Sequence, residues 1–243
     1  MRGAVSRRFS PMSANTLLIG GNSGIGLETV RKLQAAGHTL HAASRSSDQL
    51  EALGVSCQSF TAESDCDLQL PDQLDNLIYF PGTITLKPFH RLSLSDFQHE
   101  LNVNLMGAIK VMQAALPALK KSPSASVVFF STVAVQTGMP FHTSIAAAKG
   151  ALEGFARSLA AELAPKIRVN LIAPSLTDTD LAANLLKTDE QRAAAAKRHP
   201  LNQIGDPVDV ASLVDFLTSP ASQFMTGQTF RPDGGLSSLK LFS

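Results

Sequence analysis

The chain alternates short apolar runs with helical stretches from residue 15 onward, and this alternation limits the folds open to it. Several of the runs are apolar at every position, which is typical of strands covered on both faces. Strands that alternate with helices form a parallel sheet, because each parallel connection needs a crossover and a helix supplies it. The sequence therefore predicts an α/β fold. The predicted strands are 16–19, 39–43, 55–60, 76–80, 126–131, 167–172 and 228–231.

Two predicted helices carry clear signals at their N-termini. Ser93 and Asp96 have the spacing of a capping box, which predicts the start of a long helix running toward residue 116. Asp206 before Pro207 supplies a cap and a proline at the first helical position, which predicts a helix through residue 216. The segment 61–75 is short for a crossover and has room for no more than one helical turn.

Composition and charge exclude several classes of protein. Of the 243 residues, 44% are apolar and 17% are charged, so the chain can bury a core and is not disordered as a whole. No run of 18 apolar residues is present, which argues against a membrane-spanning helix. The net charge of +1 argues against a nucleic-acid partner. Two cysteines cannot build a disulfide framework or a zinc cluster, so we expect no metal and a reducing, cytoplasmic compartment.

Residues 1–13 differ from the rest of the chain. They contain three arginines and no acid, which is faintly similar to an organelle transit peptide, but they lack a secretory apolar core. The interpretation we favour is a disordered leader, or an upstream start codon with Met12 as the natural start. The folded domain is then expected to span residues 14–243.

A glycine-rich loop follows the first predicted strand and precedes an amphipathic helix. Glycine allows a sharp turn, lets backbone N–H groups approach a pyrophosphate, and lets the helix pack on the strand. In this strand–loop–helix context the motif predicts a dinucleotide site rather than a plain tight turn. The expected cofactor contacts in the loop are Gly20, Asn22, Ser23, Gly24, Ile25 and Gly26.

The end of the second predicted strand indicates which cofactor binds. An acid at this point binds the adenosine ribose hydroxyls of NAD, but here the chain has Ser44 and Arg45. A guanidinium pairs with a 2′-phosphate in a bidentate way, so NADP(H) is the expected cofactor. The alternative is that Arg45 is a solvated loop residue.

Further motifs follow the glycine loop in a fixed order. They are Asn104, Ser131-Thr132 at the end of a strand, Lys149 in the next helix, and the segments 173–179 and 233–235. Over residues 15–243 this order resembles the short-chain dehydrogenase/reductase family, and most closely its 3-oxoacyl-reductase-like branch. The resemblance implies a single doubly wound (Rossmann) domain with a seven-stranded parallel sheet flanked by helices, and a homotetramer. It also implies cofactor contacts at Pro81, Gly82, Lys149, Pro174, Thr177 and Thr179.

The chain departs from the family pattern at its acid–base centre. The family's catalytic tyrosine lies four residues before the lysine, and Ile145 occupies that place. The family's catalytic serine falls on Thr132, with Ser131 adjacent. The stretch after the fourth strand reads Tyr79-Phe80-Pro81-Gly82 instead of Asn-Asn-Ala-Gly. An isoleucine neither gives nor takes a proton, so the family's proton relay is broken at its centre.

The remaining site candidates have to be weighed one by one. Lys149 is expected to bind the nicotinamide ribose, although it could be an exposed helix lysine. Asn104 is a poor helix former in mid-helix, and in the family such an asparagine sits at a local helix irregularity near the lysine. Ser131 and Thr132 offer hydroxyls where open α/β sheets place ligands. Histidine is the side chain suited to proton transfer near neutral pH, so His142 is a candidate proton donor, or else a surface residue.

Two hypotheses of different class follow. The first is an NADP(H)-dependent oxidoreductase that acts on a small-molecule carbonyl or activated C=C substrate, with a proton from His142, Lys149 or water. The second is a nucleotide-binding pseudoenzyme with a structural or sensing role. The phosphate loop, lysine and hydroxyls favour the first, and the missing phenol favours the second. The segment 178–205 is expected to shape the substrate pocket, but its sequence does not indicate which substrate.

Overall fold

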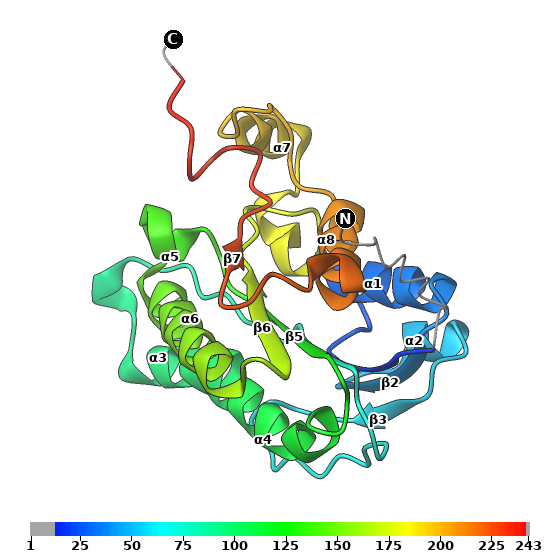
Figure 1. The fold of residues 1–243 in the computed structure, drawn as a ribbon. Helices are drawn as coiled ribbons and strands as arrows, with labels where there is room; N and C mark the ends of the chain where they lie inside the picture. The colour runs from blue at the N-terminus through cyan, green and yellow to red at the C-terminus, as the bar shows by residue number, and fades with distance from the viewer. Residues whose placement is uncertain (1–12, 242–243) are drawn as a thin grey trace, which may run out of the picture.

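The computed structural model describes residues 13–241 (Figure 1). The predicted leader therefore lies outside the described residues, except for Ser13. The hydroxyl of Ser13 is 2.6 Å from that of Thr39. No helix within the described range is long and apolar enough to cross a membrane.

One seven-stranded sheet forms the centre of the molecule, with every neighbouring pair parallel and the strand order β3-β2-β1-β4-β5-β6-β7. The predicted fold class is confirmed, and each predicted strand is present within two residues of its expected ends. The direction of the strand order reverses between β1 and β4, where doubly wound sheets bind their ligands. The strands are β1 (Asn15–Ile19), β2 (Thr39–Ser44), β3 (Cys57–Ser59), β4 (Asn76–Tyr79), β5 (Ala125–Phe130), β6 (Ile167–Ile172) and β7 (Thr229–Phe230).

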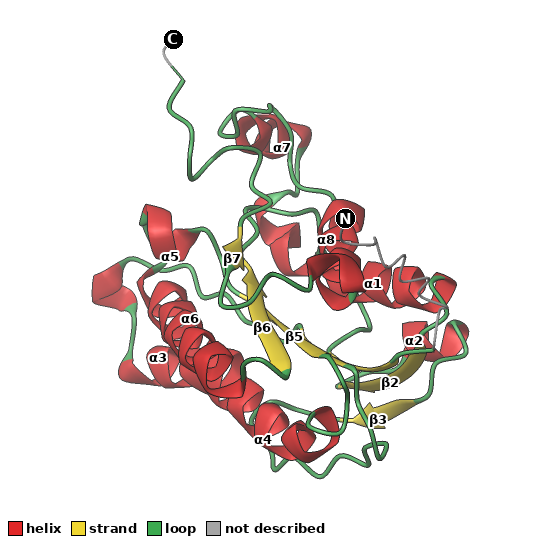
Figure 2. Cartoon of the chain, in the orientation of Figure 1, coloured by secondary structure: helices red, strands yellow, loops and turns green. Residues whose placement is uncertain are grey.

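Helices cover both faces of this sheet (Figure 2). In Figure 1, α1, α2 and α8 lie on one face, and α3, α4 and α6 lie on the other. The α-helices are α1 (Gly24–Ala35), α2 (Asp48–Ala52), α3 (Leu94–Leu101), α4 (Gly107–Leu119), α5 (Ala134–Thr137), α6 (Thr143–Leu163), α7 (Asp189–Ala196) and α8 (Pro207–Thr218). Both capping signals are confirmed, with a capping box at Ser93 and a side-chain cap from Asp206. The segment 61–75 contains neither helix nor strand.

The two faces of the sheet have separate apolar cores, because successive strand residues point to opposite sides. On β5, Phe129 packs into the core beneath α4 and α6, whereas Val128 packs into the core beneath α1 and α8. Both side chains are completely buried. This double burial explains why the strand sequences read as continuous apolar runs rather than as alternating ones.

The predicted long helix is interrupted by a π-helical turn, Asn102–Met106, between α3 and α4. The hydroxyl of Tyr79 donates a hydrogen bond to the carbonyl of Val103 in this turn, at 2.7 Å. Burial raises the pKa of Tyr79 well above its usual range, so the phenol stays neutral. Tyr79 is therefore a buried packing residue, and its hydrogen bond fastens the irregular turn to the end of β4.

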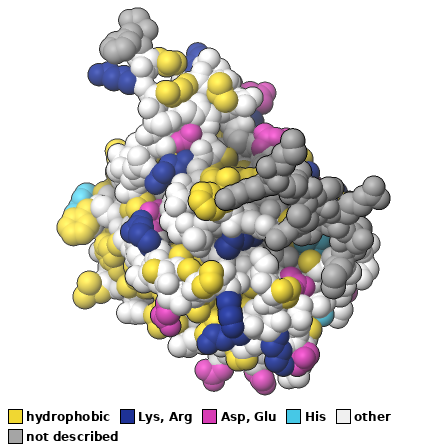
Figure 3. Space-filling view, viewed as in Figure 1, with side chains coloured by type: hydrophobic (Ala, Val, Ile, Leu, Met, Phe, Trp, Pro, Cys, Tyr) yellow, Lys and Arg dark blue, Asp and Glu magenta, His cyan; other side chains and the backbone are white. Residues whose placement is uncertain are grey.

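Charged side chains of both signs are interspersed on the face of the molecule drawn in Figure 3. Among the described side chains drawn there, basic and acidic residues both occur, in keeping with the net charge of +1.

We predict that Gly107→Ala destabilises the fold by about 1–3 kcal/mol, since overpacking forces neighbouring atoms apart. A Cβ at residue 107 would lie 2.3 Å from the Tyr79 hydroxyl oxygen and 2.7 Å from the Ala62 Cβ. The measurement is the free energy of unfolding in denaturant. Gly154→Ala is the matched control, because its Cβ would meet no atom within 4 Å. Equal stability of the two variants would contradict the close packing described here.

Candidate active site

The phosphate loop has the geometry that the glycine motif predicts. Gly24 adopts φ +50°, and a Cβ there would lie 3.0 Å from Thr179 Cγ2. A Cβ at Gly26 would lie 2.7 Å from the carbonyl oxygen of Gly20, so no side chain fits at this position. Ser23 is the N-cap residue of α1, and its side chain makes no capping bond. The first N–H groups of α1 thus remain available for an anion.

Two other segments border this loop. Pro81, after β4, lies against Gly20, where a Cβ would be 3.1 Å from the proline Cδ. Thr179, in the loop after β6, lies against Gly24. Ile25 packs instead into the core beneath α1 and α8, where it is partly buried. The loop is thus bordered by the segments that follow β4 and β6.

Gly82, Asn104 and Lys149 come together beside the ends of the central strands. A Cβ at Gly82 would lie 3.2 Å from Asn104 Oδ1 and 3.6 Å from Lys149 Nζ, so the missing side chain lets both groups approach. Asn104 is fully buried within the π-helical turn, at the kind of helix irregularity that the resemblance implies. Burial lowers the pKa of Lys149 to about 8, although the nearby charge of Glu100 opposes this change.

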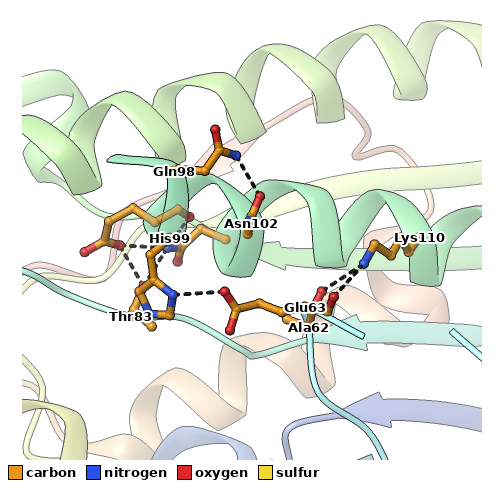
Figure 4. A network of polar contacts seen from close by, with 9 residues as sticks. Ala62, Glu63, Thr83, Gln98, His99, Asn102 and Lys110 are labelled. Atoms are coloured by element: carbon orange, nitrogen blue, oxygen red, sulfur yellow. Dashed lines mark hydrogen bonds and ion pairs between the residues drawn. The ribbon is translucent and has the colours of Figure 1, made fainter. Parts of the chain in front are cut away.

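Glu100 is a buried carboxylate that the sequence analysis missed. It lies on α3, with none of its surface exposed, and its Oε2 accepts hydrogen bonds from the Thr83 hydroxyl at 2.7 Å and from the Asn104 amide at 2.9 Å. Figure 4 shows Thr83 and, close to it, the contact between His99 and Glu63. Its spacing of four residues before Asn104 places both side chains on one helix face. That spacing is the signal that could have identified it.

The two hydroxyls at the end of β5 differ in their surroundings. Ser131 is buried, and its hydroxyl donates to the Glu153 carboxylate at 2.6 Å. Thr132 is half-buried, and its oxygen accepts from the N–H of Ala134 at 3.3 Å. Glu153 was also missed, although it lies four residues after Lys149 on the same face of α6. Of the pair, Thr132 has the more accessible hydroxyl.

Ile145 and His142 lie at the start of α6. Ile145 is 3% exposed and lies one helical turn before Lys149. His142 is the half-buried N-cap residue, and its Nδ1 lies 2.7 Å from the carbonyl oxygen of Pro140. Because a carbonyl only accepts, Nδ1 carries a hydrogen, and the Nε2 of the neutral ring is then an acceptor. Phe141, between Pro140 and His142, adopts φ +70°, a strained conformation for a bulky residue.

The phosphate loop is tied to the start of α2 by one side chain. Asn22 donates to the Ser46 hydroxyl and to the Asp48 carboxylate, and its Oδ1 accepts from the N–H groups of Gln49 and Leu50. Asn22, Ser46, Asp48 and Gln49 are among the residues that line an open cavity of about 550 Å³. Hydrogen bonds from Asn22 and Gln49 lower the pKa of Asp48, so this cavity contains a charged carboxylate that the sequence analysis did not consider.

The end of β2 lies beside a different, smaller cavity of about 150 Å³. Ser44 and Arg45 contribute to its lining, and the Arg45 side chain is exposed to solvent. Arg45 forms no ion pair with any residue in the described range 13–241. A guanidinium that is free of protein partners is available for an anionic group.

The loop after β6 is held from two sides. The hydroxyl of Thr177 donates to the carbonyl of Ser175, and Thr177 pairs with Gly205 through a parallel bridge. Ser175 follows Pro174, and its hydroxyl is 2.9 Å from Nε2 of His199, a buried histidine that the sequence analysis missed. His199 lies 24 residues away along the chain, so only the folded structure brings the two together.

The described residues contain no group of three or more His, Cys, Asp or Glu side chains arranged to hold a metal ion. The polar groups that meet near Gly82 include the Lys149 ammonium and the Asn104 amide, with the Glu100 carboxylate and the Thr83 hydroxyl bonded to that amide. Such a set can bind hydroxyl groups, donate hydrogen bonds to a carbonyl oxygen, and hold a proton.

Comparison with known proteins agrees with this geometry. A family model described as enoyl-(acyl carrier protein) reductase matches residues 71–237. A tropinone reductase homologue from Arabidopsis thaliana is 33% identical, with 96% of each chain covered. The aldohexose dehydrogenase of Thermoplasma acidophilum superposes with a TM-score of 0.86 at 24% identity, covering 97% of this chain and 98% of that one.

A second solved structure, a short-chain dehydrogenase/reductase of the glucose/ribitol dehydrogenase type from Brucella melitensis, is 28% identical with a TM-score of 0.84. The match covers 94% of this chain and 97% of the Brucella melitensis chain. The parallel sheet, the glycine loop and these matches along nearly the whole chain lead to one conclusion. The chain belongs to the short-chain dehydrogenase/reductase family.

Proposed function

We propose that this protein is an NADP(H)-dependent oxidoreductase that reduces a small carbonyl or activated C=C compound. The observation that carries the proposal is the meeting of Gly82, Asn104 and Lys149 next to an intact phosphate loop. The family uses NAD(P)(H), and its members named here are reductases and dehydrogenases. The partner is accordingly a small molecule.

The residues around the loop fit such a cofactor. The backbone of residues 20–26 would hold the pyrophosphate, because it is free of side chains at the points of closest approach. Arg45, together with Ser44, would hold the 2′-phosphate that distinguishes NADP(H) from NAD(H). The charge of Asp48 opposes that phosphate, so the preference rests on the balance between Arg45 and Asp48. The other proposed cofactor contacts are Asn22, Ser23, Pro81, Gly82, Lys149, Pro174, Thr177 and Thr179.

The side chains of the site support a reduction without a phenol. When bound, NADPH supplies a hydride. The Lys149 ammonium keeps its proton below a pH of about 8 and can release it near neutrality. The Thr132 hydroxyl can donate to the substrate oxygen without titrating, which makes it a better candidate than the buried Ser131. Ile145 at the family's tyrosine position favours conjugate reduction, since an enolate is less basic than an alkoxide and depends less on a strong acid.

His142 is a second candidate proton donor. Its Nε2 is an acceptor in the neutral ring, so it gives a proton only when the ring is charged. Lys149 lies deeper in the site and close to Gly82, whereas His142 lies at the half-buried edge of α6. We therefore favour Lys149 as the proton source, with His142 as the alternative.

A nucleotide-binding pseudoenzyme is the second candidate function. The observation that favours it is the burial of Ile145, which occupies the tyrosine position with an apolar side chain that is only 3% exposed. In that case the site would bind the nucleotide for a structural or sensing purpose, without turnover.

We also propose a homotetramer and a cytoplasmic location, following the family resemblance and the two unpaired cysteines. α6 has exposed alanines at residues 147, 151 and 161, which permit close approach of a neighbouring subunit.

The proposed function predicts oxidation of NADPH by the purified protein in the presence of at least one ketone, quinone or enoyl thioester. Gly26→Ala is expected to abolish this oxidation and NADPH binding, because its Cβ would meet the carbonyl of Gly20. Gly154→Ala is the control that keeps both. Tight NADPH binding without oxidation of any compound would favour the pseudoenzyme, and no binding at all would contradict both functions.

We predict that NADPH binds more tightly than NADH, and that Arg45→Asp weakens NADPH binding about tenfold or more with little effect on NADH. The reason is that the substitution replaces a phosphate partner with a repelling carboxylate. Fluorescence titration of both nucleotides measures the effect. Arg31→Asp makes the same charge change on α1, outside the cavity beside Asn22, and serves as the control. Equal or tighter binding of NADH by the wild type would contradict the assignment to Arg45.

We predict that Ile145→Tyr raises ketone reduction, but by less than the about 10²–10⁴-fold that well-placed general acid catalysis provides. The new hydroxyl would lie one helical turn from Lys149. The gain is limited because Ile145 is buried, and a larger ring at a packed site costs about 1–3 kcal/mol. NADPH turnover on a ketone panel is the measurement, with the melting temperature as a check on stability.

Ile145→Phe is the matched control for this change, since it adds the ring without the hydroxyl. The tyrosine variant could be as stable as the wild type and bind NADPH, yet reduce ketones no faster than the phenylalanine variant. That outcome would contradict the idea that the site lacks only a tyrosine at residue 145.

A further inference from the structure

Two buried carboxylates lie near Lys149, and only one of them is fully explained by its contacts. Glu153 accepts a hydrogen bond from Ser131 at 2.6 Å. Glu100 is completely buried, and although Oε2 has two donors, Oε1 has no hydrogen-bond partner among the described residues. A buried carboxylate with an unpaired oxygen is costly, so it calls for a compensating role.

The first effect of Glu100 is on the orientation of the Asn104 amide. Nδ2 lies 2.9 Å from Glu100 Oε2, 2.9 Å from the Glu100 carbonyl oxygen and 3.1 Å from the Thr83 hydroxyl oxygen. Because Thr83 gives its own hydrogen to Glu100, all three atoms can only accept from Nδ2. This fixes the amide group with its nitrogen toward Glu100, so Oδ1 is turned toward Gly82.

The second effect is on the charge of Lys149. The elements packed against α6 include α3, the π-helical turn, α5, β5 and β6. β5 carries no titratable side chain. The π-helical turn and α5 carry no titratable side chain, and the guanidinium of Arg168 on β6 donates to carbonyls of residues 217, 222 and 225. On α3, Asp96 pairs with Lys87 and His99 pairs with Glu63 (Figure 4). Glu100 is therefore the acid on α3 that acts on the Lys149 ammonium.

We propose that Glu100 is a positioning residue of the active site, whose carboxylate orients the Asn104 amide toward Gly82 and keeps the Lys149 side chain charged. The proposal rests on the oxidoreductase function and gives it a further requirement. Because the isoleucine at residue 145 has no transferable proton, the proton on Lys149 is the transferable proton closest to Gly82. Glu100 supplies the negative charge that lets this buried ammonium persist near neutral pH.

The test uses two variants that separate charge from shape. Glu100→Gln removes the charge but keeps an oxygen that can accept from Asn104. Glu100→Leu removes both, and it is expected to be the less stable variant, because it removes one partner of a buried pair of opposite charges. Glu162→Gln changes an exposed carboxylate on α6 and is the matched control. The NMR measurements are made on the full chain without nucleotide, so that they do not depend on turnover.

Two NMR readouts distinguish positioning from mere stabilisation. The ¹³Cε shift of Lys149, assigned with Lys149→Arg, gives its pKa in a pH titration. Hydrogen exchange of the Asn104 side-chain amide reports on its contact with Glu100. We expect Glu100→Gln to lower the pKa of Lys149 by about one pH unit or more, because an opposite charge is lost, and to leave the Asn104 exchange slow. Glu100→Leu is expected to change both readouts, and Glu162→Gln neither.

An unchanged Lys149 pKa in folded Glu100→Gln would overturn the proposal. If that variant does not fold, the same result in Glu100→Leu would overturn it. In active protein, the upper pH limit of NADPH oxidation is expected to move to lower pH in Glu100→Gln together with the Lys149 pKa. If the wild type does not bind NADPH, the proposed function is contradicted, whereas the titration of Lys149 still stands as an independent result.

Discussion

Burying the ammonium of Lys149 is the constraint around which the site is built. A charged amine removed from water is stable only when acceptors and an opposite charge surround it. The chain supplies the opposite charge from Glu100 on α3, and Gly82, which follows β4, has no side chain and so leaves room for Lys149 Nζ and Asn104 Oδ1. The π-helical turn and its hydrogen bond from Tyr79 set the position of Asn104. The irregular helix is therefore part of how the charge is accommodated.

The outline of the fold could be predicted from the sequence, because a strand buried on both faces has a continuous apolar run. Such a run can be identified without knowing which strands it pairs with. The phosphate loop, Asn104 and Lys149 could be found because each belongs to a local motif. Glu100 and Glu153 have only their spacing on a helix as a signal, and that spacing is also common on solvated faces. The contact between Ser175 and His199 left no signal, since it depends on how two loops meet in space.

The same geometry bears on the choice between an enzyme and a pseudoenzyme. A site that only binds a nucleotide has no need of a buried carboxylate next to its lysine, and replacing such a pair with apolar groups is often neutral or stabilising. Here Glu100 and Glu153 both remain buried near Lys149, and each is held by hydrogen bonds. This retained polar cluster favours chemistry over simple binding, even with Ile145 beside it.

The side chain of Asn22 has a consequence for how cofactor preference can change. Its amide joins the phosphate loop to Ser46, Asp48 and the first N–H groups of α2, and so uses all of its hydrogen-bonding groups. The segment after β2, to which we assign the choice between the two nucleotides, thus shares a support with the glycine loop. In evolution or in engineering, the segment after β2 cannot be exchanged as an independent module, because a new segment must also provide the partners of Asn22.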